Sequence, residues 1–200
     1  MTAPLTASER DVLLLLARAA IAERLFADGA LAGAVDALSI TPALQVMRAC
    51  FVTLTIPDEG GAFRLRGCIG STEARHPAHE AVVIAAVEAA FSDPRFAPVT
   101  REEFPALVLS VSLLTPMLPA ASADAVVVGR DGVMLACDGR QALFLPEVAG
   151  DHGWTREELL GQLARKAGLP AAAWRRSNLF TFQSERFGEN PNEAARIPRS

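Results

Sequence analysis

Two alternating segments joined by a turn restrict the fold of this 200-residue chain more than any other feature of its sequence. In 50–56 every second residue is apolar, which is the period of a β-strand with one buried face. Residues 62–69 follow after 57–61, where a proline and two glycines favour a turn. This order predicts a β-hairpin, and therefore a fold in which strands follow strands directly.

Three helices are predicted around this hairpin. The capping boxes Thr6 with Glu9 and Thr155 with Glu158 mark the starts of two amphipathic helices. The segment Pro77–Phe91 is apolar almost all round, which is typical of a helix buried between layers.

Further strands are predicted from the same kind of alternation. Their ranges are 107–114, 125–128, 133–137, 141–145 and 178–187. The pair Asp138-Gly139 indicates a type I′ hairpin turn between two of them. The chain is therefore expected to be an α+β protein with mainly antiparallel strands and packed helices.

Composition argues against several classes of protein. A net charge of −4 with no basic run is unlike a nucleic-acid-binding surface, and the apolar runs are too short to span a membrane. No basic segment precedes an apolar run at the N-terminus, so we expect a cytoplasmic protein. Abundant alanine and an arginine-dominated basic set indicate a GC-rich, bacterial genome. The three cysteines lack Cys-x-x-Cys spacing and are expected to be free thiols.

The stretch 63–71 concentrates groups that carry chemistry. Read as an unbroken strand, it places Arg64, Arg66 and Cys68 on one face and the apolar residues on the other. Neighbouring cations favour a thiolate, so Cys68 is a candidate nucleophile or ligand-contacting thiol. The alternative is a packing residue beside a tight turn. Gly67 and Gly70 either let an anion approach the backbone or permit close strand packing.

Other polar residues have two interpretations each. At a turn that ends a helix, Asp93 and Arg95 either contact a ligand, or Asp93 forms an ion pair with Arg95 or with Arg66. Glu147 follows an apolar segment, so it either faces a cleft or pairs with an arginine. His76 and His79 lie near a helix start, which favours a solvated helix end over a metal site.

Several motifs together resemble the AMMECR domain family, known in prokaryotes as protein A of the AmmeMemoRadiSam system. They are Leu-Arg-Gly-Cys-Ile-Gly at 65–70, Ser-Asp-Pro-Arg-Phe at 92–96, Ser-Val-Ser-Leu-Leu at 110–114, Leu-Pro-Glu-Val-Ala at 145–149 and Gly-Trp at 153–154. The resemblance extends from about residue 8 to residue 187. It implies an α+β fold of two subdomains, one larger than the other, with the glycine-cysteine motif near their junction.

The resemblance also implies an organisation and partners. We expect a single AMMECR-like domain at 1–187 and a flexible tail at 188–200. A radical S-adenosylmethionine protein and a Memo-like protein are the implied partners. The chain departs from the family at Asp131-Gly132, where many members carry His-Gly. If that histidine acts as a base, Asp131 would have to replace it.

The combined hypothesis is a site for a polar or anionic small molecule in the cleft between the subdomains. Its predicted catalytic residue is Cys68, and no metal or cofactor is implied. Its predicted ligand-binding residues are Arg66, Gly67, Gly70, Ser71, Asp93, Arg95 and Glu147. The alternative is a non-catalytic partner or substrate-presenting module for the radical S-adenosylmethionine and Memo-like proteins.

Overall fold

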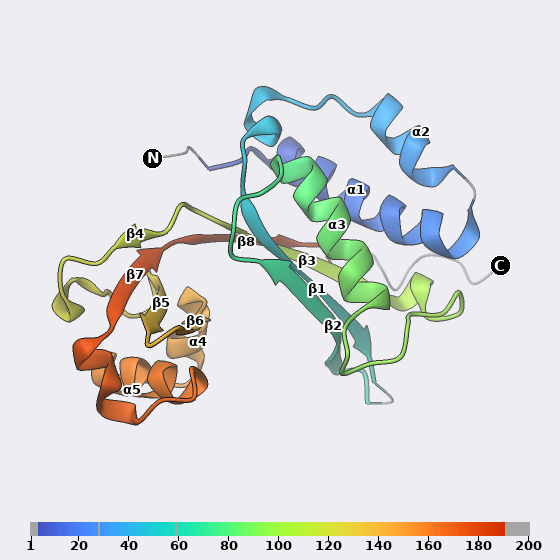
Figure 1. The fold of residues 1–200 in the computed structure, drawn as a ribbon. Helices are drawn as coiled ribbons and strands as arrows, with labels where there is room; N and C mark the ends of the chain where they lie inside the picture. The colour runs from blue at the N-terminus through green and yellow to red at the C-terminus, as the bar shows by residue number, and fades with distance from the viewer. Residues whose placement is uncertain (1–3, 28, 59, 191–200) are drawn as a thin grey trace. The chain divides into compact units, whose positions relative to one another are not determined.

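A computed structural model describes residues 4–27, 29–58 and 60–190 of the chain. The chain divides into two compact units, each with its own sheet and core (Figure 1). The larger unit comprises Met1–Leu113 and Glu185–Ser200, and the smaller unit comprises Leu114–Ser184. The α+β fold with a larger and a smaller subdomain and antiparallel sheets is thereby confirmed.

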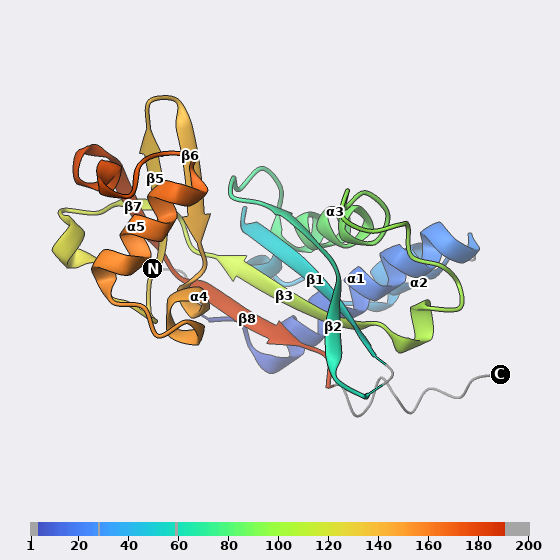
Figure 2. The same cartoon turned by 90° about the horizontal axis from the view of Figure 1, so that it is seen from below.

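The larger unit is built on a four-stranded sheet with the strand order β2-β1-β3-β8. Figure 2 shows these strands side by side. Their bounds are Ala49–Pro57 for β1, Phe63–Ser71 for β2, Val108–Leu114 for β3 and Ser184–Gly188 for β8. Among the residues that the structure describes, strand β2 pairs with β1 alone, so its other edge faces away from the sheet.

Helices cover one face of this sheet (Figure 1). They are α1 (Ala7–Phe26), α2 (Ala30–Ala37) and α3 (Ala78–Phe91), with α3 in contact with β1, β2 and α1. Short 3₁₀ helices at Pro42–Gln45 and Phe104–Ala106 precede β1 and β3. The inward positions of the strands and helices form one apolar core between the layers.

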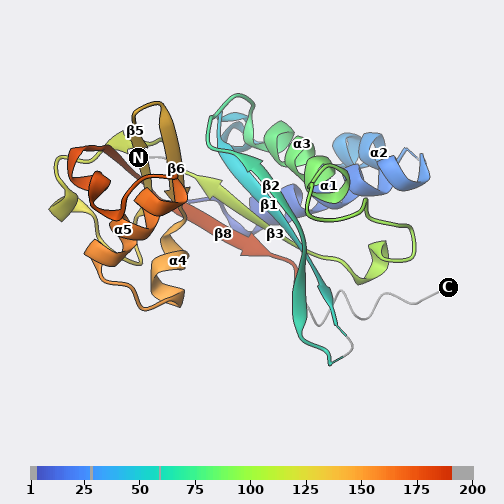
Figure 3. The ribbon, with the colours of Figure 1, turned by 60° about the horizontal axis from the view of Figure 1, so that its bottom comes forward.

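The smaller unit has a second four-stranded sheet in the order β4-β7-β5-β6. Its strands are β4 (Leu118–Pro119), β5 (Gly132–Cys137), β6 (Arg140–Phe144) and β7 (Asn178–Phe182). Its helices are α4 (Pro146–Asp151) and α5 (Arg156–Lys166), with 3₁₀ turns at Ala123–Ala125 and Ala171–Arg176. Figure 3 shows α5 beside the β5–β6 hairpin, where its apolar face forms the second core.

Most predicted elements are found close to their expected positions. Both capping boxes are present, with the Thr6 and Thr155 side chains accepting from the third residue of their helices. Asp138 and Gly139 both have positive φ, as a type I′ turn requires. No helix within the described residues is both long and apolar enough to cross a membrane.

Two strand predictions were wrong. Residues 125–128 contain no strand: Ala125 ends a 3₁₀ helix and Val128 begins a turn. The Val127 amide donates a hydrogen bond to the Asp131 carboxylate, and the Val127 carbonyl accepts one from the Asp131 amide. The predicted strand 178–187 is two strands, β7 and β8, which belong to different sheets. The expected tail lies mostly outside the described residues, and the division at residue 187 stays a prediction.

Candidate functional site

The central motif lies on β2, whose register against β1 contains a β-bulge. Leu54 is opposite Gly67 and Thr55 is opposite Leu65, so Arg66 is the extra residue. The bulge interrupts the alternation of side chains along the strand. The expectation that Arg64, Arg66 and Cys68 share one face is therefore wrong.

The bulge places Cys68 opposite Thr53, on the sheet face turned away from the helices. The Cys68 sulfur lies 3.2 Å from Thr53 Oγ1, in hydrogen-bond contact. Cys68 is half-buried, whereas Val52 and Leu54 on either side of Thr53 are fully buried toward the helices. The thiol is thus separated from the apolar core and adjoins a hydroxyl group.

The backbone of Cys68 is held from the free edge of β2 by an ion pair. Asp93 Oδ2 accepts a hydrogen bond from the Cys68 amide at 2.9 Å, and Arg95 Nη2 donates to the Cys68 carbonyl at 3.3 Å. The two side chains also bind each other, with Arg95 Nη2 2.7 Å from Asp93 Oδ2. Asp93 and Arg95 therefore occupy the position of a neighbouring strand at this residue.

Electrostatics fix the charge state of this pair. The Arg95 guanidinium, supported by the amides of Cys68 and Arg95, holds the pKa of Asp93 well below its usual range. Asp93 in turn raises the pKa of Arg95. The Asp93 side chain is 2% exposed and that of Arg95 is 54% exposed. The predicted ion pair thus exists, and its arginine is the part that solvent can reach.

Arg66 is engaged elsewhere. Its guanidinium makes two hydrogen bonds to the Glu103 carboxylate, at 2.8 and 2.9 Å, and a longer one to the Pro98 carbonyl. Only 7% of the Arg66 side chain is exposed, and its hydrogen bonds lower the pKa of Glu103. Arg66 therefore joins the bulge of β2 to the segment before β3.

The two motif glycines are required by close packing. A Cβ atom at Gly67 would lie 2.1 Å from the Ala89 carbonyl oxygen on α3, and one at Gly70 would lie 2.1 Å from the Cys50 carbonyl oxygen. Neither contact is tolerable, so both positions need glycine whether or not an anion binds there. The structure thus supports the packing interpretation of these residues.

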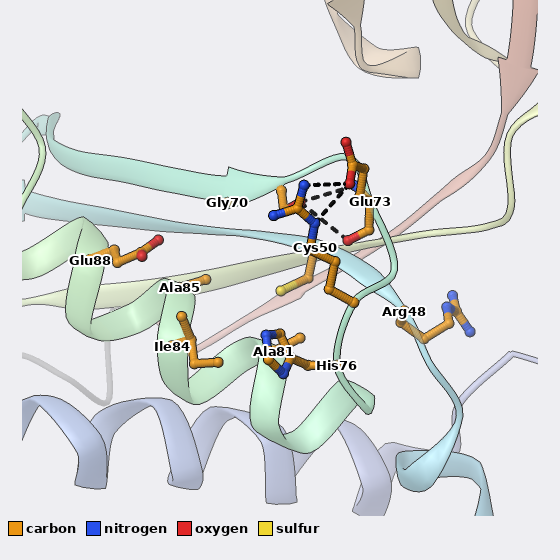
Figure 4. Close-up of a pocket in the computed structure, with 11 residues that line it drawn as sticks. Arg48, Cys50, Gly70, Glu73, His76, Ala81, Ile84, Ala85 and Glu88 are labelled. Atoms are coloured by element: carbon orange, nitrogen blue, oxygen red, sulfur yellow. Dashed lines mark hydrogen bonds and ion pairs between the residues drawn. The ribbon is translucent and has the colours of Figure 1, made fainter.

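Gly70 and Ser71 line a pocket of about 280 Å³ at the end of β2 (Figure 4). Ser71 lies opposite Cys50 in the strand register, on the side of the sheet that faces α3. Cys50 is 2% exposed, and burial raises the pKa of its thiol to about 12. The motif therefore contributes to two places, with Cys68 on one face of the sheet and Gly70-Ser71 beside a pocket on the other.

A model of the family described as AMMECR1 matches residues 14–187 of this chain. The chain belongs to the AMMECR1 family. It is 38% identical over 198 residues to a protein of Thermofilum pendens, covering 92% of each chain. It is 40% identical over 151 residues to Protein MJ0810 of Methanocaldococcus jannaschii, covering 71% of this chain and 73% of the relative.

A solved AMMECR1-family structure has the same fold. Uncharacterized Protein PH0010 from Pyrococcus horikoshii superimposes with a TM-score of 0.78 and 33% identity, covering 93% of this chain and 94% of that one. These relatives are archaeal, and the bacterial origin inferred from composition stays a prediction. The family resemblance drawn from the sequence motifs is confirmed.

Asp131, where the family resemblance led us to expect a histidine, is built into a turn. Its carboxylate binds the Arg130 guanidinium at 2.8 Å and accepts from the Val127 amide at 3.0 Å. The Arg130 hydrogen bonds lower the pKa of Asp131. A carboxylate with a depressed pKa is a weak base, so Asp131 is a poor replacement for a catalytic histidine.

Glu147 and His79 were also singled out in the sequence. Glu147 belongs to the smaller unit, in the first turn of α4 after Pro146, where a carboxylate suits the helix N-terminus. Its place in a ligand site stays a prediction. His79 Nδ1 lies 2.9 Å from the Leu44 carbonyl oxygen, and no metal-binding group of three His, Cys, Asp or Glu exists within the described residues.

Sequence reasoning missed two residues that contact the motif. Thr53 was visible as a polar residue in an apolar strand, but its contact with Cys68 depends on the register of the hairpin. The sequence indicated Glu103 only as the last residue of a capped turn that begins at Thr100. Its pairing with Arg66 spans 37 residues, and no local pattern predicts it.

Proposed function

We propose that this AMMECR1-family chain binds a polar or anionic small molecule at Cys68, with the thiol as its reactive or recognition group. The observation that carries the proposal is the half-buried Cys68 thiol, whose position is fixed by its neighbours. Its backbone is held by Asp93 and Arg95, and its sulfur contacts Thr53. A thiol needed only for packing requires neither a hydroxyl neighbour nor a charged support on its backbone.

Arg95 supplies the ligand-facing charge in this proposal. Its side chain is 54% exposed and donates to the Cys68 carbonyl, so part of the guanidinium is available beside the thiol. Arg66 acts indirectly, because its charge is balanced by Glu103 under near-complete burial. If the site is catalytic, nucleophilic attack by the Cys68 thiolate is the reaction class to test.

The biological setting of this proposal is the AmmeMemoRadiSam system. A radical S-adenosylmethionine protein and a Memo-like protein would supply or use the molecule bound at Cys68, and the chain would act in the cytoplasm. Three free cysteines support a reducing compartment, where thiols persist.

Site-resolved alkylation of the native protein tests the role of Cys68. Cys137 is the matched control, because it is also half-buried and has Arg176 Nη1 3.3 Å from its sulfur. We expect Cys68 to react faster than Cys137 at neutral pH, and Arg95→Gln to slow Cys68 without changing Cys137. Labelling of Cys68 only after unfolding would refute the accessible-thiol site.

A second candidate function is a non-catalytic partner module. The observation that favours it is the exposed apolar part of β2, where Phe63 is 44% and Leu65 is 38% exposed on an edge strand. Exposed apolar side chains beside unpaired strand groups suit protein docking. In this alternative the same motif face presents a surface to the radical S-adenosylmethionine or Memo-like protein.

Co-purification with those two proteins, taken from the same organism, tests the alternative. Leu65→Glu should abolish a complex while leaving the fold intact, because Leu65 is exposed. Leu15→Glu on α1 is the control, because it makes the same change at another exposed leucine of the larger unit. Absence of any complex at about micromolar concentration would count against this module.

A further inference from the structure

The pocket beside α3 has a small, apolar floor. Its inner surface includes the Cys50 thiol and the Ala81 and Ala85 side chains, and Ile84 forms a wall that is 39% exposed. Figure 4 shows Cys50 facing these three residues of α3 across the pocket. Because burial keeps the Cys50 thiol protonated, the floor offers contacts to an aliphatic group and no charge.

The rim of the pocket carries an ion pair that a ligand can reach. Glu73 Oε2 lies 2.6 Å from Arg75 Nη2, and the two side chains are 62% and 69% exposed. Glu73 stands above Cys50 in Figure 4. An exposed ion pair is only weakly stabilising. Each of the two side chains can therefore leave the other and pair with an opposite charge on a ligand.

Charge and size restrict the class of ligand. Two arginines, Arg48 and Arg75, and two glutamates, Glu73 and Glu88, line the pocket. With equal numbers of each charge, the lining does not favour a multiply charged anion such as a phosphate ester. The volume of about 280 Å³ is at the lower limit of small-molecule pockets, which hold roughly 300 Å³ or more. A small ligand with an aliphatic body and both signs of charge fits these conditions.

We propose that this pocket binds a free aliphatic amino acid. The side chain lies on the floor formed by Cys50, Ala81 and Ala85, the α-carboxylate binds Arg75, and the α-ammonium binds Glu73. Only one carbon separates the two charged groups of an α-amino acid, as the adjacency of Glu73 and Arg75 requires. The site is independent of the proposed Cys68 function, because Cys50 and Cys68 lie on opposite faces of the sheet.

Calorimetric titration of the full chain with L-leucine tests this proposal. We expect saturable binding at concentrations up to about 1 mM, together with a rise in melting temperature. The probes 4-methylpentanoate, which is leucine without its α-ammonium, and 3-methylbutylamine, which is leucine without its α-carboxylate, each lack one charge. Each should bind at least about tenfold more weakly, a loss of about 1.4 kcal/mol. Equal binding of either probe would overturn the zwitterion assignment.

Variants separate this pocket from other surfaces. Arg75→Gln should weaken L-leucine binding at least about tenfold. Arg64→Gln removes an exposed arginine of β2 that does not line the pocket, and this variant should bind L-leucine like the parent chain. Cys68→Ser should also bind normally, whereas it would abolish the function proposed for Cys68. Unchanged binding by Arg75→Gln, or no saturable binding of L-leucine, would reject the pocket assignment.

Discussion

The Asp93 carboxylate accepts a hydrogen bond from the backbone amide of Cys68 at 2.9 Å. The two residues are 25 positions apart in the sequence, so this bond ties the end of α3 to the free edge of β2. Arg95 completes the tie through the Cys68 carbonyl. The contact leaves the thiol itself unengaged by either side chain. Asp93 is therefore a positioning residue for Cys68, and its removal should affect stability and thiol environment together.

Asp93→Ala should lower the free energy of unfolding by about 1 to 3 kcal/mol, because a buried amide loses its partner and Arg95 loses its counter-ion. Asp93→Asn retains an acceptor and should cost less. Urea unfolding of both variants measures the difference. Equal stability of Asp93→Ala and the parent chain would contradict the edge-holding role.

Low pH should weaken the contribution of Asp93 to the stability of the fold. Its pKa is lowered in the folded chain, so this contribution is fully present above the unfolded value of about 3.9 and is lost as pH falls further. The gap in melting temperature between the parent and Asp93→Asn should thus narrow from pH 6 toward about pH 3. Asp36→Asn, at an exposed position of α2, is the control for the loss of one carboxylate.

The stability of the chain at high pH should depend on the buried Cys50 thiol. Its folded pKa of about 12 lies above the unfolded value of about 8.5, so the unfolded chain releases a proton first. The contribution of Cys50 to stability is then complete below about pH 8 and declines as pH rises toward 12. Between about pH 8.5 and 10 the parent should lose more stability than Cys50→Ala does, measured by urea unfolding. A parallel decline in both proteins would exclude this linkage, and Cys137→Ala provides the comparison.

Gly67→Ala should be severely destabilising. The new methyl group would lie 2.1 Å from the Ala89 carbonyl oxygen, so α3 or β2 must move, at a cost of about 3 kcal/mol or more. Gly33→Ala is the matched control, since its methyl group meets nothing within 4 Å and it lies in α2. That control should gain about 0.5 to 1 kcal/mol. Thermal unfolding distinguishes the two, and a stable Gly67→Ala protein would contradict the packing described.

The parts of the fold that local sequence determines were predictable. The boxes at Thr6-Glu9 and Thr155-Glu158 satisfy helix-end amides within four residues, and Asp138-Gly139 adopts its turn without distant help. These features depend only on residues close in the sequence. The pattern of the sequence therefore predicts them as the structure has them.

The parts that depend on pairing were not predictable. The bulge at Arg66 exists because the guanidinium reaches Glu103 and because Gly67 must approach Ala89. The alternation of apolar and polar residues gives no sign of either contact. A prediction from that alternation therefore placed Cys68 on the same face as Arg64 and Arg66, which is wrong. The candidate thiol was identified from the sequence, but its partners Thr53 and Asp93 required the register of the sheet and the edge of β2.

The order of strands has a consequence for synthesis. In the larger unit, β3 lies between β1 and β8, yet residues 115–183, nearly all of the smaller unit, separate β3 from β8 in the chain. As the chain leaves the ribosome, β3 must therefore wait with one edge unpaired while the smaller unit, which is continuous in sequence, is completed. The unit that begins first in the sequence is the one that can finish folding last.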